Sequence, residues 1–169
     1  MNENILALDQ SLTETGWYCK DGYGVILTDK KDIDRMLDIR GKITQLIKKY
    51  KINIIVIEDF SFASKGRAIF ELGGLGWMLR LLASDLKINL VVVDTSMLKK
   101  FITGKGNSKK EVMLLEVYKK YGFDTHNNNI ADAFALFKFY EEYIKWKGGK
   151  SFTKLKIEEF KKLKKVYYR

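Results

Sequence analysis

The sequence predicts one α/β domain, in which a mixed five-stranded sheet carries helices on both faces and a basic helical tail follows. Short β-branched runs alternate along the chain with longer segments whose apolar residues recur at helical spacing. An early hairpin signal precedes strand–helix–strand units, and this order produces a sheet with antiparallel and parallel pairs. The 169 residues, 46% of them hydrophobic, suffice for a sizeable core. We assign residues 1–146 to the domain and 147–169 to the tail.

The strands are predicted from apolar runs and one turn signal. The first strand is expected at residues 4–9, which end in ILALD. GWYCK (16–20) and GVILT (24–28) flank the dipeptide DG, which is typical of a hairpin turn. INIIVIED (52–59) and INLVVVD (88–94) are β-branched runs bounded by polar residues, as in buried parallel strands.

The helices are predicted from apolar spacing and capping residues. Residues 32–50 place their apolar side chains on one side, as an amphipathic helix does. Residues 68–86 are apolar enough for a buried helix, although glycines inside it cost roughly 1 kcal/mol each relative to alanine. Ser108 is a suitable N-cap for one of the later helices. These later helices are expected at 95–103, 109–121, 127–146 and, in the tail, from residue 151.

Charge and composition limit the classes of function. The net charge is +10, and the last 25 residues hold nine Lys, one Arg and two Glu, which leaves the rest of the chain nearly neutral. Such a tail favours a polyanionic partner, either nucleic acid or an anionic membrane surface. One cysteine and one histidine exclude an internal disulfide and the usual zinc sites, and they favour a reducing compartment. We find no signal peptide and no membrane-spanning run, so we expect a cytoplasmic protein without a membrane partner.

Carboxylates stand where the predicted strands end. Asp9 ends the first strand and Glu58 the fourth, and Asp132 lies near the start of the last long helix. A bare carboxylate at the end of a buried strand is costly unless it is paired or ligates a metal. Three acids on three elements can converge only if cations offset their repulsion, and two Mg²⁺ ions about 3.5–4 Å apart do so in phosphodiester hydrolysis. With a basic chain, this pattern indicates a metal-dependent nuclease.

Each acid also has an ordinary structural interpretation. An Asp at a strand end is often a cap, and an Asp early in a helix can complement the helix dipole. Asp59 could be the functional acid in place of Glu58, since alternation along a strand points the two in opposite directions. Asp94 ends a strand as Asp9 does. On pattern alone, these alternatives stay open.

Four motifs span about residues 4–140, in the order ILALDQSLTETGW, IVIEDFSFASKGRAIFELGG, TGKGNSKKEV and NNNIADAFAL. Together, and in this order, they resemble the RuvC family of Holliday-junction resolvases, which has a ribonuclease H-like fold. The chain is similar to the short phage-type members of that family.

The resemblance implies an active site. Lys110 matches the basic residue near the scissile phosphate, and Asn129 stands where the family usually has a fourth acidic or histidine ligand. Asn129 could offer an oxygen but no charge, so Asn129→Asp is expected to lower the Mg²⁺ requirement; His126 is a weaker alternative. The residues that match the metal-binding carboxylates are Asp9, Glu58 and Asp132.

The resemblance also implies contacts with DNA. Phe60 and Phe62 straddle the position of an aromatic residue that enters the junction. The basic amphipathic tail could pack its apolar side on the domain and leave its lysines solvated, or the docked helix could turn these lysines towards a DNA arm. We expect the contact with DNA, and we expect deletion of residues 151–169 to weaken binding while leaving the acids and their metals in place. The basic residues expected to bind DNA are Lys65, Arg67, Lys105, Lys109, Lys154, Lys161, Lys162 and Lys165.

The expected function is hydrolysis of branched DNA, most specifically of four-way junctions, by a homodimer with two Mg²⁺ or Mn²⁺ ions per site, to 5′-phosphate and 3′-hydroxyl ends. A flap nuclease of the same fold and a catalytically silent junction-binding protein are the alternatives. Actin-like sugar kinases and ATPases also begin with an Asp-containing strand and hairpin, but they need two such domains and a second phosphate loop.

Overall fold

The structure is a computed structural model that describes residues 3–59, 68–163 and 165–167. Its described strands form one sheet in the order β3-β2-β1-β4-β5-β6, in which β1, β4 and β5 are parallel and the other pairings are antiparallel. The predicted five-stranded mixed sheet is confirmed, and a short sixth strand joins its edge. The strands are β1 (Ile5–Asp9), β2 (Glu14–Cys19), β3 (Gly22–Leu27), β4 (Ile54–Glu58), β5 (Asn89–Val93) and β6 (Lys165–Tyr167).

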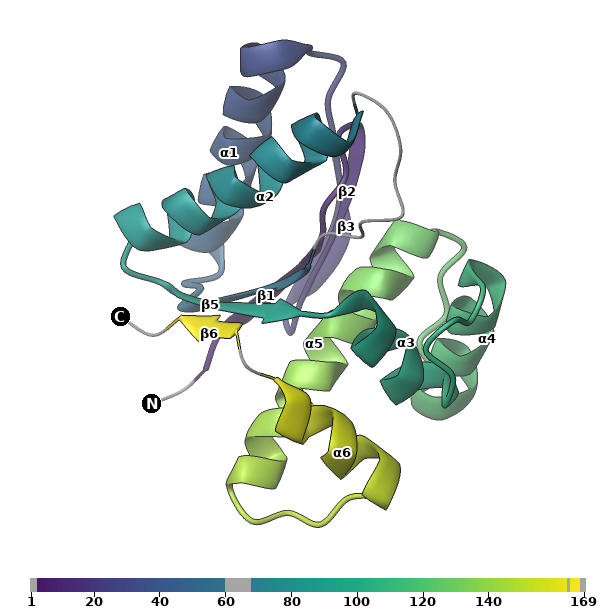
Figure 1. Ribbon diagram of the computed structural model, residues 1–169. Coiled ribbons are helices and arrows are strands. Elements are labelled where there is room, and N and C mark those ends of the chain that lie inside the picture. Colours follow the sequence, from purple (N-terminus) through teal and green to yellow (C-terminus); the bar gives the residue numbers. More distant parts are fainter. Residues whose placement is uncertain (1–2, 60–67, 164, 168–169) are drawn as a thin grey trace.

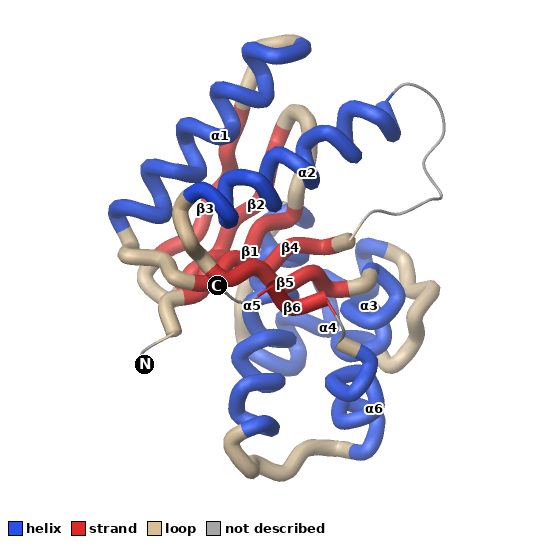
Figure 2. Tube along the Cα trace, turned by 60° about the vertical axis from the view of Figure 1, so that its left-hand side comes forward, coloured by secondary structure: helices blue, strands red, loops and turns tan. Residues whose placement is uncertain are grey.

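Helices cover both faces of the sheet, as the sequence predicts. Figures 1 and 2 show α1 and α2 on one side of the sheet and α3, α4, α5 and α6 on the other. The helices are α1 (Asp32–Lys49), α2 (Ala68–Asp85), α3 (Thr95–Thr103), α4 (Lys110–Tyr121), α5 (Asn128–Lys147) and α6 (Lys154–Lys162). None of the helices in these parts of the chain is long and apolar enough to span a membrane.

The central strands are apolar on both faces because each face meets a helical layer. In β1, Leu6 and Leu8 belong to the core formed with α1 and α2, whereas Ile5 and Ala7 belong to the core on the opposite face. All four are buried. The strand therefore reads as an unbroken apolar run, and its first residue able to face water is Asp9.

Small residues bring α5 close to the sheet. Ala131, Ala133 and Ala135 are buried, and α5 packs mainly on β1 and β2. Gly16 in β2 has no side chain at the contact, and a Cβ atom there would lie 2.1 Å from the carbonyl oxygen of Asn129. The spacing between β2 and the first turn of α5 therefore depends on Gly16.

The C-terminal segment is part of the core. Phe160 of α6 is only 1% exposed, and it packs against rings of α3 and α5, among them Phe101 and Phe139. Deleting residues 151–169 would remove this ring and β6 together. The apolar side of the tail thus docks on the domain, and the predicted effect of deletion on DNA binding would be mixed with a loss of core packing.

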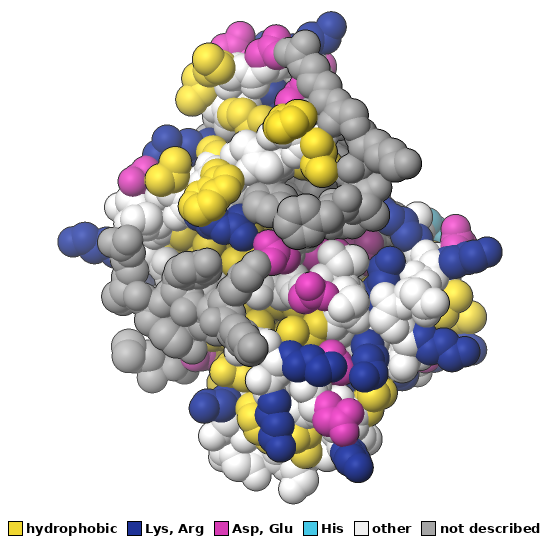
Figure 3. Space-filling view, in the orientation of Figure 1, with side chains coloured by type: hydrophobic (Ala, Val, Ile, Leu, Met, Phe, Trp, Pro, Cys, Tyr) yellow, Lys and Arg dark blue, Asp and Glu magenta, His cyan; other side chains and the backbone are white. Residues whose placement is uncertain are grey.

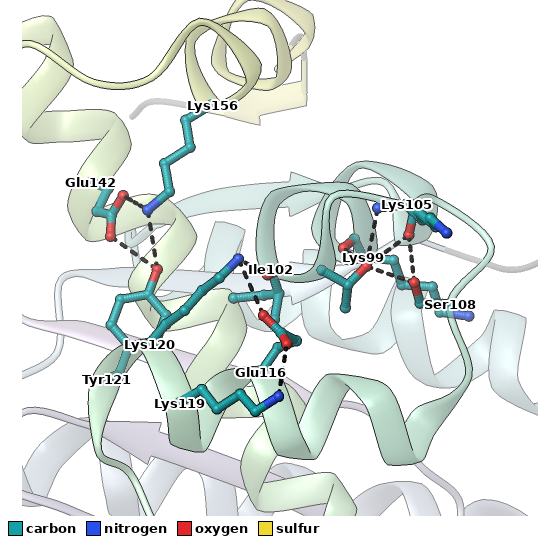
Figure 4. A network of polar contacts seen from close by, with 11 residues as sticks. Lys99, Ile102, Lys105, Ser108, Glu116, Lys119, Lys120, Tyr121, Glu142 and Lys156 are labelled. Carbon is teal, nitrogen blue, oxygen red and sulfur yellow. Dashed lines mark hydrogen bonds and ion pairs between the residues drawn. The ribbon is translucent and has the colours of Figure 1, made fainter.

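The predicted tail helix is also shorter than expected. It ends at Lys162, and residues 165–167 form β6, which pairs antiparallel with β5. Strand pairing satisfies backbone groups at the sheet edge that a helix would leave open. Figure 4 shows how α6 is also held by a polar contact, in which Lys156 donates to Glu142 of α5 and Tyr121 of α4 donates to the same carboxylate.

Candidate active site

Two of the predicted acids are brought together by strand register. β1 and β4 are parallel neighbours in which Leu8 pairs with Ile57, so Asp9 and Glu58 come next at the same edge of the sheet. Both carboxylates line one pocket. Parallel strands that end at the same edge commonly place ligand-binding residues there.

The third acid arrives from α5. Asn127 caps this helix by accepting hydrogen bonds from the backbone N–H groups of Asn129 and Ile130, and its amide donates to Glu14 in β2 at 2.6 Å. This cap and the close approach at Gly16 hold the first turn of α5 against β2. Asp132, one turn further along, lines the same pocket as Asp9 and Glu58.

Burial and mutual repulsion make these carboxylates hard to ionise. Burial raises the pKa of Asp9 well above its ordinary value, and the charges of Asp132 and Glu58 raise it further. Burial and the charge of Glu58 raise the pKa of Asp132 to about 6, and burial also raises the pKa of Glu58. Clustered acids with raised pKa values are typical of a functional site that a cation completes.

Two lysines face the acids. Lys110 begins α4, lines the pocket, and its charge lowers the pKa of Asp9, Glu58 and Asp132. Lys99 of α3 also lines the pocket and acts in the same direction on Glu58 and Asp132. Lys99 was missed by the sequence reasoning, and the only signal for it is its place on the helix that follows β5.

The loop before α4 is held by side-chain hydrogen bonds. Ser108 does not cap α4, whose N-cap residue is Lys109 without a side-chain cap bond. The Ser108 hydroxyl instead donates to the carbonyl of Lys105, as Figure 4 shows. It also forms a hydrogen bond with the hydroxyl of Thr103. These hydrogen bonds connect the loop to the end of α3, close to Lys110, the first residue of α4.

The two alternative acids have structural partners. Asp94 is the N-cap of α3 and accepts hydrogen bonds from the backbone N–H groups of Ser96 and Met97. Asp59 lies at the pocket, and its carboxylate pairs with Arg80 of α2 at 3.3 Å. Glu58 lines the pocket as well, and hydrogen bonding with Thr95 partly offsets the rise in its pKa that burial causes.

The structure does not bring the expected fourth ligand into the pocket. Asn129 is absent from the described residues that line it, and its amide nitrogen donates to the Glu14 carbonyl at 3.0 Å and to the Glu14 carboxylate at 3.2 Å. It turns towards β2 because α5 starts there. His126 is exposed in the preceding loop and does not line the described pocket either.

The residues expected to contact DNA are only partly described. Lys105 and Lys109 are exposed on the loop before α4, Lys154, Lys161 and Lys162 are exposed on α6, and Lys165 begins β6. Figure 3 shows acidic side chains in the middle of one face with lysine and arginine side chains beside and below them. The predictions for Phe60, Phe62, Lys65 and Arg67 concern positions outside the described residues.

Comparison with known proteins decides the family. The family model for the crossover junction endodeoxyribonuclease RuvC matches residues 14–137. The chain belongs to the RuvC family. A RuvC from Rickettsia typhi is 30% identical over 145 residues, which cover 78% of this chain and 92% of that protein. One from Ehrlichia canis is 28% identical over 144 residues, which cover 79% and 92%.

Solved RuvC structures share the fold. Thermus thermophilus RuvC superposes with a TM-score of 0.70 at 15% identity, covering 85% of this chain and 96% of that one. The same protein in complex with a Holliday junction substrate gives a TM-score of 0.68, also at 15% identity, covering 80% and 90%. The ribonuclease H-like fold predicted from the motifs is therefore confirmed.

RuvC membership implies a general dependence on divalent metal ions, and the pocket fits such an ion. In the described parts of the chain, no three His, Cys, Asp or Glu side chains stand close enough to enclose a metal ion already. The carboxylates of Asp9, Glu58, Asp59 and Asp132 nevertheless line the pocket, and Gln10 adds a buried side-chain oxygen without a hydrogen-bond partner among the described residues. Carboxylate and amide oxygens are the ligands that Mg²⁺ and Mn²⁺ prefer.

Proposed function

We propose that this protein is a crossover junction endodeoxyribonuclease that cleaves Holliday junctions by hydrolysis of phosphodiester bonds. One observation supports this above others: in a member of the RuvC family, three carboxylates from β1, β4 and α5 line one pocket together with two lysines. Each predicted catalytic residue of the sequence analysis, Asp9, Glu58, Asp132 and Lys110, lines that pocket.

The proposed chemistry divides between the acids and the lysines. Asp9, Glu58 and Asp132 would hold two Mg²⁺ or Mn²⁺ ions, which supply hydroxide at neutral pH and offset charge on the reacting phosphate. Lys110 would stabilise the negative charge that develops on the phosphate oxygens, and Lys99 faces the same pocket with the same charge. The expected products carry 5′-phosphate and 3′-hydroxyl ends.

A cleavage assay tests this function. Four-way junction, flap and linear duplex DNA of matched length are incubated with the protein and Mg²⁺, beside the Asp9→Asn variant. We expect symmetric nicks in the junction, no comparable cleavage of linear duplex, and binding without cleavage by Asp9→Asn. If the protein cleaves the flap in preference to the junction, the flap becomes the proposed substrate. Cleavage by Asp9→Asn at the wild-type rate would refute the proposed active site.

We propose further that exposed lysines on α6 and on the loop before α4 contact the DNA arms. Because Phe160 lies in the core, substitution of surface lysines is a cleaner test than deletion. Replacing Lys154 and Lys161 by Gln should reduce the slope of log affinity against log salt by about 0.9 for each lost phosphate contact. Lys20→Gln, in the turn after β2, is the matched control. An unchanged slope in the double variant would remove α6 from the DNA-binding surface.

We propose a homodimer, and its interface would use the exposed apolar side of α1 and α2. Ile33, Leu37, Phe70, Trp77 and Leu81 are between 58% and 79% exposed. Figure 3 shows hydrophobic side chains gathered over these two helices. Several large apolar side chains exposed on neighbouring helices are typical of an interaction site.

The glycines of α2 are consistent with a partner at this surface. Apart from the neighbouring residues and the backbone of the helix itself, no described atom lies within 4 Å of the place where a Cβ of Gly73 or Gly74 would be, so packing against other described elements does not explain these two glycines. Sedimentation at micromolar concentration should show a dimer that Trp77→Ala weakens and Tyr118→Ala, an exposed aromatic of α4, leaves intact. A wild-type monomer both with and without junction DNA would contradict the homodimer.

We place the activity in the cytoplasm of a bacterium or of a phage-infected cell. Cys19 is buried and has no disulfide partner, and burial raises the pKa of its thiol. A buried thiol of this kind is compatible with a reducing compartment and has little reactivity.

A further inference from the structure

Gln10 combines a fixed hydrogen bond with a buried oxygen that lacks a partner. Its Nε2 donates to the backbone carbonyl of Glu58 at 2.9 Å, which ties the end of β1 to the end of β4. Its Oε1 is buried and is the one such side-chain polar atom without a hydrogen-bond partner in the described parts of the chain. Gln10 lines the pocket beside Asp9, Glu58 and Asp132.

The orientation of this amide follows from its neighbour. If the amide were reversed, Oε1 would face the Glu58 carbonyl oxygen, and two acceptors would meet without a proton between them. The unsatisfied atom is therefore an oxygen with two free lone pairs. A buried acceptor that receives no hydrogen bond is unfavourable for folding, so a buried oxygen without a donor calls for a functional explanation.

The surroundings define what can satisfy this oxygen. Four carboxylates line its pocket, those of Asp9, Glu58, Asp59 and Asp132, and when ionised they accept hydrogen bonds or ligate cations but donate nothing. Lys99 and Lys110 line the same pocket, and neither donates a hydrogen bond to Oε1. A divalent cation, or a water molecule bound to one, suits Oε1 and the carboxylates at once. A neutral amide adds a ligand without adding to the repulsion among the acids, and Gln oxygens serve in this way at sites for hard cations.

We propose that Gln10 supplies a neutral oxygen to the divalent cation site formed by Asp9, Glu58 and Asp132. This inference rests on the proposed function, and it assigns to the residue after Asp9 the neutral oxygen that the sequence analysis expected from Asn129. The backbone hydrogen bond to Glu58 makes Gln10 suited to this role, because one amide can both orient the second acid strand and face the cation.

The test is titration of Mn²⁺ into the DNA-free protein by calorimetry, with thermal unfolding of each metal-free variant beside it. Gln10→Met keeps the length of the side chain but offers a thioether, which hard cations avoid. It should raise the Kd for Mn²⁺ by about 10-fold, as loss of a supporting ligand typically does. Gln10→Glu keeps an oxygen but loses the Nε2 donor, and its Kd should equal or fall below that of the wild type.

The two variants separate a cation ligand from a structural strap. Both lose the hydrogen bond to Glu58, so a purely structural role would weaken Mn²⁺ binding in both, and this result would overturn the inference. A Kd for Gln10→Met within twofold of the wild type would overturn it too. Gln45→Leu on the exposed surface of α1 controls for loss of an amide, and Asn129→Asp controls for an added charge outside the pocket lining.

The same titration distinguishes failure of this inference from failure of the proposed function. Asp9→Asn should weaken Mn²⁺ binding more than Gln10→Met does. If the wild type binds no Mn²⁺, or if Asp9→Asn binds it as well as the wild type, the cation site itself is wrong. If Asp9→Asn loses binding and Gln10→Met does not, only the role of Gln10 fails.

Discussion

Replacing Gly16 by alanine should move a catalytic acid without touching any acid. The new Cβ would lie 2.1 Å from the carbonyl oxygen of Asn129 and 2.3 Å from its carbonyl carbon. Both are backbone atoms in the first turn of α5, so no side-chain rotation can relieve the contact. The turn must therefore retreat from β2, and Asp132, one turn further on, retreats with it.

The size of this movement follows from the contact itself. Non-bonded carbon atoms are in optimal contact at about 3.5–4.0 Å, so even a compressed contact requires a shift of roughly 1 Å. A displacement of about 1 Å at a catalytic constellation can cost about 100-fold in rate. Overpacking of this kind also lowers the free energy of unfolding by about 1–3 kcal/mol. We expect a folded protein with strongly reduced cleavage.

The assay compares single-turnover junction cleavage, junction binding and urea unfolding for the wild type and two variants. Gly16→Ala should bind junctions normally, because the exposed lysines are unchanged. Gly41→Ala is the control, since no described atom lies within 4 Å of its added Cβ apart from the neighbouring residues and the backbone of the same helix. An alanine inside α1 should stabilise the fold by about 1 kcal/mol. Cleavage by Gly16→Ala at the wild-type rate would show that contact with β2 does not set the position of Asp132.

Three further predictions follow from the same structure. The pKa of Asp132 is raised from 3.8 to about 6, so its ionisation destabilises the metal-free fold as pH rises through that range. In EDTA, Asp132→Asn should therefore raise the melting temperature more at pH 7.5 than at pH 5. An equal gain at both pH values would contradict this. Asn129→Asp should not lower the Mg²⁺ concentration for half-maximal cleavage, because the new carboxylate would face Glu14, which now accepts hydrogen bonds from the Asn129 amide. A lower Mg²⁺ requirement would support Asn129 as a metal ligand after all. Phe160→Ala should lower the free energy of unfolding in urea by about 3–5 kcal/mol, whereas Lys161→Ala, at an exposed position, should change it by no more than about 0.5 kcal/mol. Equal values for the two variants would show that α6 does not contribute to the core.

Local patterns in the sequence were enough to predict the central strands, most of the helices and the position of the acids. Strand and helix periodicity depends on neighbours a few residues apart, so the runs that end at Asp9 and Glu58 are visible without a structure. Because parallel strands end at a common edge, even the meeting of these two acids could be expected. Asp132 was a candidate from its place near the start of a helix, the resemblance added Lys110, and the pocket contains both.

Tertiary structure decided the features that depend on partners distant in the chain. Asp94 and Asp9 look alike at strand ends, and only the contacts show that Asp94 caps a helix while Asp9 faces two other acids. Asn129 turns to Glu14, 115 residues away, and Gln10 turns to Glu58, 48 residues away. The tail likewise changes from helix to strand where the edge of β5 offers unpaired backbone groups. Periodicity depends on residues close together in the sequence, so it can be seen without a structure. Hydrogen-bond partners are chosen only when packing brings distant segments of the chain within reach of one another.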